Sequence, residues 1–235
     1  MAQPTLLLTR PAAQSQEFAE RCRAALGPDL AVVISPVLSI RPRDSAPDLG
    51  SFRGVVLTSA NGARALAAQA DVCGVRAWCV GDRTAEAARR LGMDARSAAG
   101  SADELVDMVA GEPGPLLHAH GAESRGRVAE RLTAAGTETR EAVLYDQVAQ
   151  PLSAEARRLL DGDGPVILPL FSPRSAALVA AAAGGARAPL CLASLSAAVD
   201  AAWTGPAPAA RRIAERPDAA ALVRCVTALF RGELP

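Results

Sequence analysis

The sequence predicts an α/β protein built on parallel sheets, and three observations support this prediction. Short apolar runs alternate with segments of helical periodicity along the whole chain, which is the order of a parallel sheet with helices on both faces. Gly27, Gly92, Gly136 and Gly162 follow predicted helices, where a C-terminal cap favours glycine. Half of the 235 residues are apolar but only 3% are aromatic, so the core must be built from Ala, Val and Leu.

The predicted elements follow from these patterns in chain order. Apolar runs predict strands at 5–8, 31–34, 54–57, 77–80, 116–119, 141–144, 166–170, 190–193 and 211–214. Helical periodicity predicts helices at 14–26, 60–69, 84–91, 102–109, 125–135, 153–160, 174–183, 197–203 and 218–230. The stretches 36–47 and 145–151 fit neither pattern well, and we expect them to be extended connectors between domains.

An internal repeat indicates two similar halves. VLTSANGARAL from Val56 matches LPLFSPRSAAL from Leu168, which aligns Ser59 with Ser172. CVGDRTAEAA from Cys79 matches CLASLSAAVD from Cys191, and FAERCRAALG from Phe18 matches VAERLTAAG from Val128. All three matches have a spacing of about 110 residues, as expected of a duplicated unit.

Charge and cysteine content exclude several classes of function. The 25 basic residues are all arginines and balance 25 acidic ones, so the charge gives no reason to expect a nucleic-acid partner. Without lysine the chain has no Schiff base, pyridoxal phosphate anchor or P-loop. Five cysteines without a CxxC pair predict reduced thiols in a cytoplasmic protein. The apolar runs are too short for a signal peptide or a membrane span, so we expect neither.

Four turns place hydroxyl side chains directly after a predicted strand. They lie at 58–62, 81–84, 171–175 and 194–196, and bring Ser59, Thr84, Ser172 and Ser196 to the start of a helix. In a parallel sheet such turns lie at the carboxyl ends of the strands, where ligands bind. Helix N-termini offer free N–H groups and a partial positive charge to carboxylate or phosphate. Each hydroxyl alone is also explained as a helix N-cap, whereas four in two facing domains indicate a cleft that binds anions.

Two further residue types are candidates for chemistry. Tyr145, the single tyrosine, ends a predicted strand beside Asp146, where its phenol could donate a proton to a leaving group or serve as an interface aromatic. His118 and His120 lie on one face of a predicted strand, but two histidines without a further ligand nearby do not predict a metal site. The serine-hydrolase, zinc-protease and dinucleotide-binding motifs do not occur in the sequence.

These motifs together resemble the uroporphyrinogen-III synthase family. The segments that carry the resemblance are LLLTRP at 6–11, LTSANGA at 57–63, VGDRTA at 80–85, LY at 144–145 and LFSPRSA at 170–176. The resemblance implies two flavodoxin-like, doubly wound parallel-sheet domains joined by a two-stranded linker. One domain would hold residues 1–36 and 152–235, the linker 37–47 and 145–151, and the inserted domain 48–144.

The resemblance also implies an enzyme, a lyase that uses no cofactor or metal. Its substrate would be hydroxymethylbilane, a linear tetrapyrrole with acetate and propionate on every ring. The enzyme would release the terminal hydroxyl as water and invert ring D through a spiro intermediate to give uroporphyrinogen III. Holding the two ends of the substrate together would supply much of the catalysis. We expect a cytoplasmic monomer with this small molecule as its partner.

By resemblance, Tyr145 occupies the family's tyrosine position and would assist loss of the hydroxyl. The residues expected to bind substrate lie at the strand-to-helix turns and are Arg10, Thr58, Ser59, Asn61, Gly62, Arg83, Thr84, Ser172, Arg174, Ser175, Ser194 and Ser196.

Three other interpretations remain open at this point. A non-catalytic module of the same fold could bind a tetrapyrrole or another small molecule, although Tyr145 and hydroxyls in both halves favour the enzyme. A periplasmic solute-binding protein would need an export signal. A phosphosugar enzyme would usually add a His or Glu general base in the cleft.

Overall fold

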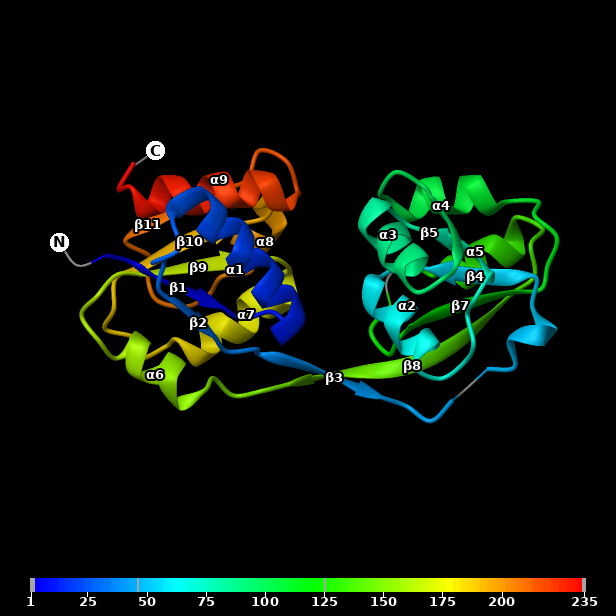
Figure 1. The fold of residues 1–235 in the computed structure, drawn as a ribbon, viewed down its shortest axis with the longest axis horizontal. Helices are drawn as coiled ribbons and strands as arrows, with labels where there is room; N and C mark the ends of the chain where they lie inside the picture. Colours follow the sequence, from blue (N-terminus) through cyan, green and yellow to red (C-terminus); the bar gives the residue numbers. More distant parts are fainter. Residues whose placement is uncertain (1–2, 46, 125, 234–235) are drawn as a thin grey trace. The chain divides into compact units, whose positions relative to one another are not determined.

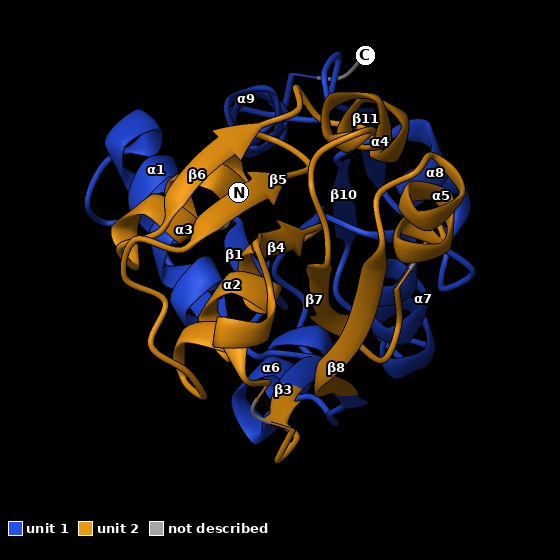
Figure 2. Cartoon of the chain, turned by 90° about the vertical axis from the view of Figure 1, so that its right-hand side faces the viewer, with its two compact units in different colours: residues 1–39, 148–235 blue, residues 40–147 orange. Residues whose placement is uncertain are grey.

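The computed structural model describes residues 3–45, 47–124 and 126–233. The chain divides into two compact units (Figure 1). Unit 1 comprises Met1–Ser39 and Val148–Pro235, and unit 2 comprises Ile40–Gln147 (Figure 2). Each unit is a mainly parallel sheet covered by helices, so the predicted α/β class is confirmed. Among the described residues, no helix combines the length and apolarity needed to cross a membrane.

Unit 1 is built on a five-stranded sheet. Its elements are β1 (Thr5–Leu8), α1 (Ala12–Leu26), β2 (Val32–Ile34), α6 (Ala154–Leu160), β9 (Val166–Leu170), α7 (Pro173–Ala182), β10 (Leu190–Ser194), α8 (Ala197–Ala201), β11 (Ala210–Ile213) and α9 (Ala219–Phe230). The strand order is β11-β10-β9-β1-β2, and the pairs are parallel. Counted within the unit, this is the flavodoxin-like order 2-1-3-4-5.

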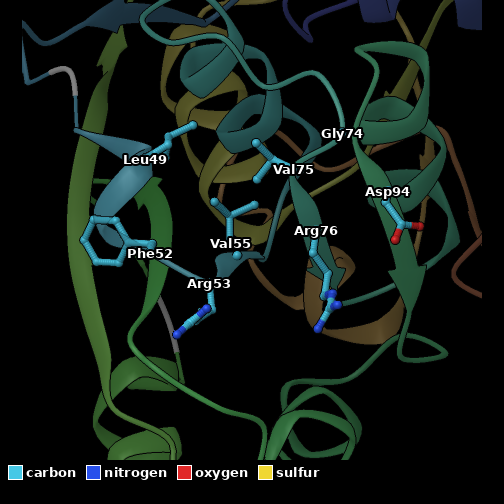
Figure 3. A pocket seen from close by; sticks show the side chains of 9 residues that line it. Leu49, Phe52, Arg53, Val55, Gly74, Val75, Arg76 and Asp94 are labelled. Carbon is cyan, nitrogen blue, oxygen red and sulfur yellow. The ribbon is translucent and has the colours of Figure 1, made fainter.

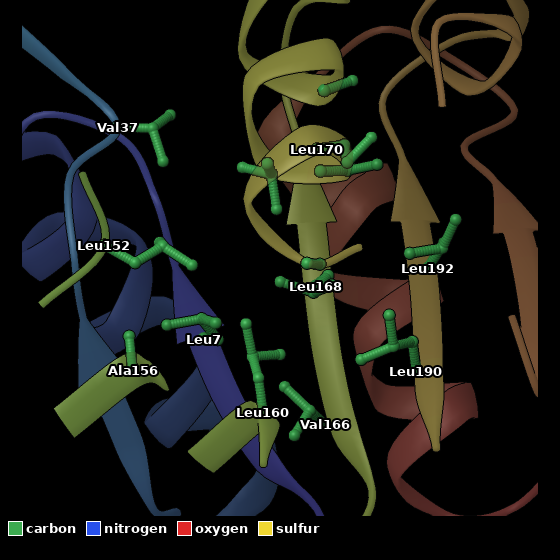
Figure 4. Packing of buried hydrophobic residues seen from close by; sticks show 14 of the residues in the cluster. Leu7, Val37, Leu152, Ala156, Leu160, Val166, Leu168, Leu170, Leu190 and Leu192 are labelled. Atoms are coloured by element: carbon green, nitrogen blue, oxygen red, sulfur yellow. The ribbon is translucent and has the colours of Figure 1, made fainter. Parts of the chain in front are cut away.

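Helices bury both faces of this sheet because successive strand side chains point to opposite faces. Leu7 packs in a cluster with α6, α7 and α8, whereas Leu6 and Leu8 pack with α1 and α9. Figure 4 shows the first of these faces, where Leu168 of β9 and Leu192 of β10 lie on the same side of the sheet. Strands buried on both faces read as continuous apolar runs, which explains why the sequence pattern located them.

Unit 2 is built on a six-stranded sheet of order β3-β8-β7-β4-β5-β6. Its elements are β3 (Leu38–Pro42), which begins in unit 1, the short 3₁₀ helix η1 (Leu49–Ser51), β4 (Gly54–Leu57), α2 (Ala60–Ala67), β5 (Arg76–Cys79), α3 (Asp82–Arg90), β6 (Asp94–Ser97), α4 (Ala102–Val109), β7 (Leu116–Gly121), α5 (Val128–Ala134) and β8 (Thr139–Ala149). The strands from β8 to β6 pair in parallel. Their order, 3-2-1-4-5, is the other common doubly wound arrangement. Helices α2 and α3 cover one face, and α4 and α5 the other.

Strands β3 and β8 are neighbours and carry the chain between the units. The Arg43 N–H donates to Leu144 O at 2.9 Å, and the Arg43 guanidinium donates twice to the Asp146 carboxylate, at 2.9 and 2.7 Å. The hydrogen bonds from Arg43 lower the pKa of Asp146. Farther along, Gln150 N–H donates to Val37 O at 2.8 Å.

The sequence pattern missed one strand of unit 2 and predicted one helix start three residues too early. Strand β6 carries exposed Asp94 and Arg96 at the sheet edge, so it has no apolar run. The helix predicted from 125 begins at Val128, and residue 125 lies outside the described residues.

Candidate functional site

Each doubly wound sheet has one point at which its strand order reverses, and ligands bind outside the carboxyl ends of the strands there. In unit 2 this switch point lies between β4 and β7, and in unit 1 between β9 and β1. Thr58 and Ser59 follow β4, while Phe171 and Ser172 follow β9. The topology therefore places a predicted hydroxyl turn at the switch point of each unit.

In unit 2, Ser59 joins helix α2 to Tyr145. Ser59 is the N-cap of α2, and its Oγ accepts the Gly62 N–H at 3.0 Å. The same Oγ lies 3.1 Å from the hydroxyl of Tyr145, which is only 3% exposed. Because Ser59 Oγ already accepts a backbone hydrogen bond, its own proton remains available to the Tyr145 oxygen.

A β-bulge in β8 aims Tyr145 at Ser59. His120 pairs with Val143, but Gly121 pairs with Tyr145, so Leu144 is the extra residue. As a result Leu144 and Tyr145, although consecutive, both pack in the cluster under α2 and α3. Bulges of this kind re-aim side chains beside functional sites.

Two glycines allow close packing around this tyrosine. A Cβ atom on Gly121 would lie 2.5 Å from Tyr145 Cε2, so the ring occupies the space that a side chain would need. A Cβ atom on Gly62 would lie 2.7 Å from Ala119 O, so α2 approaches the backbone of β7. Both contacts are far shorter than normal van der Waals separations, and both positions therefore require glycine.

On the opposite face of the same strands, His118 and His120 form a stacked pair with ring centroids 4.4 Å apart. His118 Nε2 lies 3.4 Å from Thr58 Oγ1, and His120 Nδ1 lies 2.7 Å from Gly121 O. The other nitrogens, His118 Nδ1 and His120 Nε2, lie 3.6 and 3.5 Å from Glu141 Oε1. Burial and, second, the charge of His120 lower the pKa of His118 to about 3, so His118 is neutral at physiological pH.

In unit 1, the switch point brings Arg10 and Phe171 together. Arg10 Cζ lies 4.2 Å from the centroid of the Phe171 ring, within cation–π range. Ser172 caps α7 by accepting the Ser175 N–H at 3.2 Å, and the two hydroxyl oxygens lie 2.8 Å apart. Arg174 is on the first turn of the same helix and is partly buried. This edge therefore combines two arginines, two hydroxyls and a helix N-terminus.

The interpretation of Thr84 as an N-cap is wrong. Helix α3 begins at Asp82 with Gly81 as its N-cap, so Thr84 lies inside the first turn and is buried. Arg83 precedes it and is exposed. A Cβ atom on Gly81 would lie 3.3 Å from Gly100 Cα, tighter than most such contacts, so this N-cap position has little room for a side chain.

In the corresponding turn of unit 1, Ser194 and Ser196 have different roles. Ser194 is fully buried and donates to Asp200 Oδ1 at 2.9 Å, while Arg211 donates to the other oxygen of that carboxylate at 2.9 Å. The Ser194 hydroxyl is therefore used inside the fold. Ser196 is the N-cap of α8 and accepts the Val199 N–H at 3.4 Å.

A cavity of about 290 Å³ lies elsewhere in unit 2 (Figure 3). Gly54, Arg76 and Asp94, which begin β4, β5 and β6, line it together with Phe52. It therefore lies at the amino ends of the strands, away from the predicted hydroxyl turns.

Gly121 and Glu141 do not stand out as site residues in the sequence. Gly121 lies opposite Tyr145 because a β-bulge shifts the pairing of β7 with β8 at this point. Glu141 lies beside the histidines because the register of the same two strands pairs it with His118. The detectable signals were the spacing of His118 and His120 and the glycine that follows them.

Comparisons with known proteins found one family model and several similar solved structures. A family model described as uroporphyrinogen-III synthase HemD matches residues 16–224. The crystal structure of a uroporphyrinogen-III synthetase from Helicobacter pylori 26695 is similar, with a TM-score of 0.66 and 13% identity over 96% of this chain and 99% of that chain. A mutant uroporphyrinogen III synthase from the extremely thermophilic bacterium Thermus thermophilus has a TM-score of 0.51 and 13% identity over 97% of this chain and 98% of that chain. Among curated proteins, none matches the chain.

We predict that Gly121→Ala destabilises the protein by about 1–3 kcal/mol, because the added methyl group displaces the Tyr145 ring from a packed site. Urea denaturation measures this change as a lower midpoint. Gly164→Ala is the matched control, since a Cβ atom there meets no atom within 4 Å. Equal stability of the two variants would show that the Tyr145 ring is not fixed by Gly121.

Proposed function

Because the chain belongs to the uroporphyrinogen-III synthase family, we propose that Tyr145 and the hydroxyl turns carry out the family's reaction in this protein. Membership makes the chain an enzyme of tetrapyrrole biosynthesis, a lyase-type cyclase that acts on a small molecule. The reaction closes hydroxymethylbilane to uroporphyrinogen III with loss of water. The observation that carries the proposed roles is the 3.1 Å contact between Tyr145 and Ser59 at the unit 2 switch point.

In this proposal Tyr145 donates its phenolic proton to the terminal hydroxyl of the substrate. The C–O bond breaks, its electron pair leaves with the oxygen as water, and the pyrrole nitrogen lone pair supplies electrons to the carbon. Ser59 supports this step, because its Oγ accepts from Gly62 N–H and can donate its own proton to the Tyr145 oxygen. That donation stabilises the phenolate that remains.

The substrate carries a carboxylate on every side chain, so we propose that the turns at the switch points bind these groups. The N-termini of α2 and α7 present free N–H groups there. Arg10 and Arg174 add positive charge in unit 1, and arginine is well suited to pair with a carboxylate. The proposed set further contains Thr58, Asn61, Gly62, Arg83, Ser172, Ser175 and Ser196, whereas buried Thr84 and Ser194 support the turns from inside.

A coupled assay tests the function itself. Freshly made hydroxymethylbilane is supplied without added metal or cofactor, the products are oxidised, and the uroporphyrin isomers are separated by chromatography. Ring closure without the enzyme gives isomer I, so protein-dependent isomer III supports the proposal. Isomer I alone from folded protein would favour a non-catalytic tetrapyrrole-binding module of the same fold.

We predict that Tyr145→Phe lowers kcat by about 100-fold, because general acid catalysis contributes at least that much in typical enzymes. The isomer assay measures the change as the rate of isomer III formation. Ser51→Ala removes a hydroxyl near the amino end of β4 and is the control expected to retain full activity. An unchanged kcat in Tyr145→Phe would remove the proposed role.

We predict that Arg174→Gln raises KM by about tenfold and leaves kcat nearly unchanged, because a lost charge-assisted hydrogen bond costs about 1.5–3 kcal/mol of binding. Steady-state kinetics over a range of hydroxymethylbilane concentrations measure both constants. Arg158→Gln neutralises an exposed arginine of α6 and should change neither constant. A selective loss of kcat in Arg174→Gln would contradict a pure binding role.

We also propose that the protein is a cytoplasmic monomer. All five cysteines are free thiols, as in a reducing compartment, and Ile213 is the single exposed large hydrophobic among the described residues, at 45% exposure. An obligate interface usually needs a broader apolar patch. We predict a mass near 24.1 kDa by light scattering, and a mass twice as large would show a dimer.

A further inference from the structure

Three side chains on neighbouring strands of unit 2 converge on one point. His118 and His120 come from β7, and Glu141 comes from β8, where it is paired directly with His118. One ligand atom from each residue lies within 4.8 Å of the other two. The histidines are buried, whereas the Glu141 side chain is 48% exposed, so the cluster lies between the interior and the surface of the unit.

The hydrogen bonds of this cluster leave two lone pairs without partners. Gly121 O can only accept, so His120 Nδ1 carries the proton and Nε2 carries a lone pair. When His118 donates from Nε2 to Thr58 Oγ1, its Nδ1 is likewise a lone pair. Neither His118 Nδ1 nor His120 Nε2 has a hydrogen-bond partner, although both atoms are buried. Both face the carboxylate of Glu141, which also only accepts.

Buried polar atoms without partners are costly, and three acceptors directed at one point call for a cation. We propose that His118 Nδ1, His120 Nε2 and the Glu141 carboxylate bind a divalent transition-metal ion, with Zn²⁺ as the ion that best fits two imidazoles and one carboxylate. This set matches the two-histidine, one-carboxylate sites that leave a fourth position open to water.

Two of the three distances between ligand atoms fit such an ion, and the third, between the two imidazole nitrogens, is within 4.8 Å. Zn–N and Zn–O bonds of about 2.0–2.2 Å in a tetrahedral site place ligand atoms about 3.4 Å apart. The Glu141 oxygen lies 3.6 Å from His118 Nδ1 and 3.5 Å from His120 Nε2. Both separations are too long for good hydrogen bonds but suit two atoms that share one metal ion.

The far side of each imidazole is also held as in known metal sites. Ligating histidines generally pass their other N–H to a carbonyl, carboxylate or similar group, which fixes the tautomer and the ring. His120 Nδ1 meets Gly121 O at 2.7 Å, and His118 Nε2 meets Thr58 Oγ1 at 3.4 Å. These partners direct the remaining nitrogen of each ring toward Glu141.

The fold itself does not require polar residues at the positions of His118 and Glu141. In unit 1, β1 and β2 occupy the places of β7 and β8 in the sheet, and Leu8 pairs with Ile34 where His118 pairs with Glu141. Apolar side chains thus fill the equivalent place. This local geometry is separate from the proposed catalytic roles of Tyr145 and Ser59.

The test is metal binding to the full chain after treatment with a chelator. Calorimetric titration with Zn²⁺ should give one ion per chain, and Zn²⁺ should raise the thermal unfolding midpoint. Because free cysteines could also bind Zn²⁺, titration with Co²⁺ identifies the ligands. A nitrogen and oxygen site gives visible d–d bands without a near-ultraviolet thiolate-to-cobalt band.

Two variants and one control decide the outcome. Glu141→Gln keeps size and lies at a half-exposed position, and His120→Asn removes a buried ligand; each should weaken binding at least tenfold. Glu130→Gln is the control, because Glu130 of α5 lines the same surface depression as Glu141 but lies outside the cluster. This variant should bind Zn²⁺ with the same affinity as the parent protein. No binding, a thiolate band, or equal affinity in Glu141→Gln and the parent protein would overturn the proposal.

Discussion

The pairing of β1 with β9 is the constraint on which unit 1 depends. Thr5 pairs with Val166 and Leu6 with Ile167, so the first strand is held by a strand that follows all of unit 2 in the sequence. Leu6, Leu7 and Leu8 are nearly fully buried, and burying one leucine contributes about 1.5–3 kcal/mol. Without the pairing of β1 with β9, the side chains on both faces of β1 would lose their packing against the helices of unit 1. The same strand pair forms the switch point, which brings Arg10 beside Phe171.

The repeat in the sequence explains how the two sheets are related. When β4, β5 and β6 are matched with β9, β10 and β11, and β7 and β8 with β1 and β2, both sheets have the same strand order. Ser59 and Ser172 then cap equivalent helices, and Phe18 and Val128 lie in equivalent helices α1 and α5. The chain is therefore a tandem repeat in sequence whose copies exchange strands in space. The orders 2-1-3-4-5 and 3-2-1-4-5 are one arrangement counted from two starting points.

The fold was largely predictable because its central strands are buried on both faces and read as apolar runs. The prediction failed where a strand is half exposed, as at Asp94 and Arg96 of β6, or where close backbone contact replaces a capping hydroxyl, as at Gly81. Within the candidate site, the Ser59 and Ser172 turns followed from the sequence alone. The contact between Ser59 and Tyr145 did not, because it depends on a bulge that no local pattern encodes.

The geometry of β4 and β7 explains how one sheet edge holds two different groups of side chains. Thr58 and Ser59 are consecutive and point to opposite faces, so Thr58 meets His118 while Ser59 meets Tyr145. Gly121 serves both faces: its carbonyl oxygen lies 2.7 Å from His120 Nδ1, and its missing side chain makes room for the Tyr145 ring. A movement of Gly121 would therefore disturb the histidine pair and the tyrosine together. The backbone at this residue therefore links the two groups, although no side chain of one group needs to touch the other.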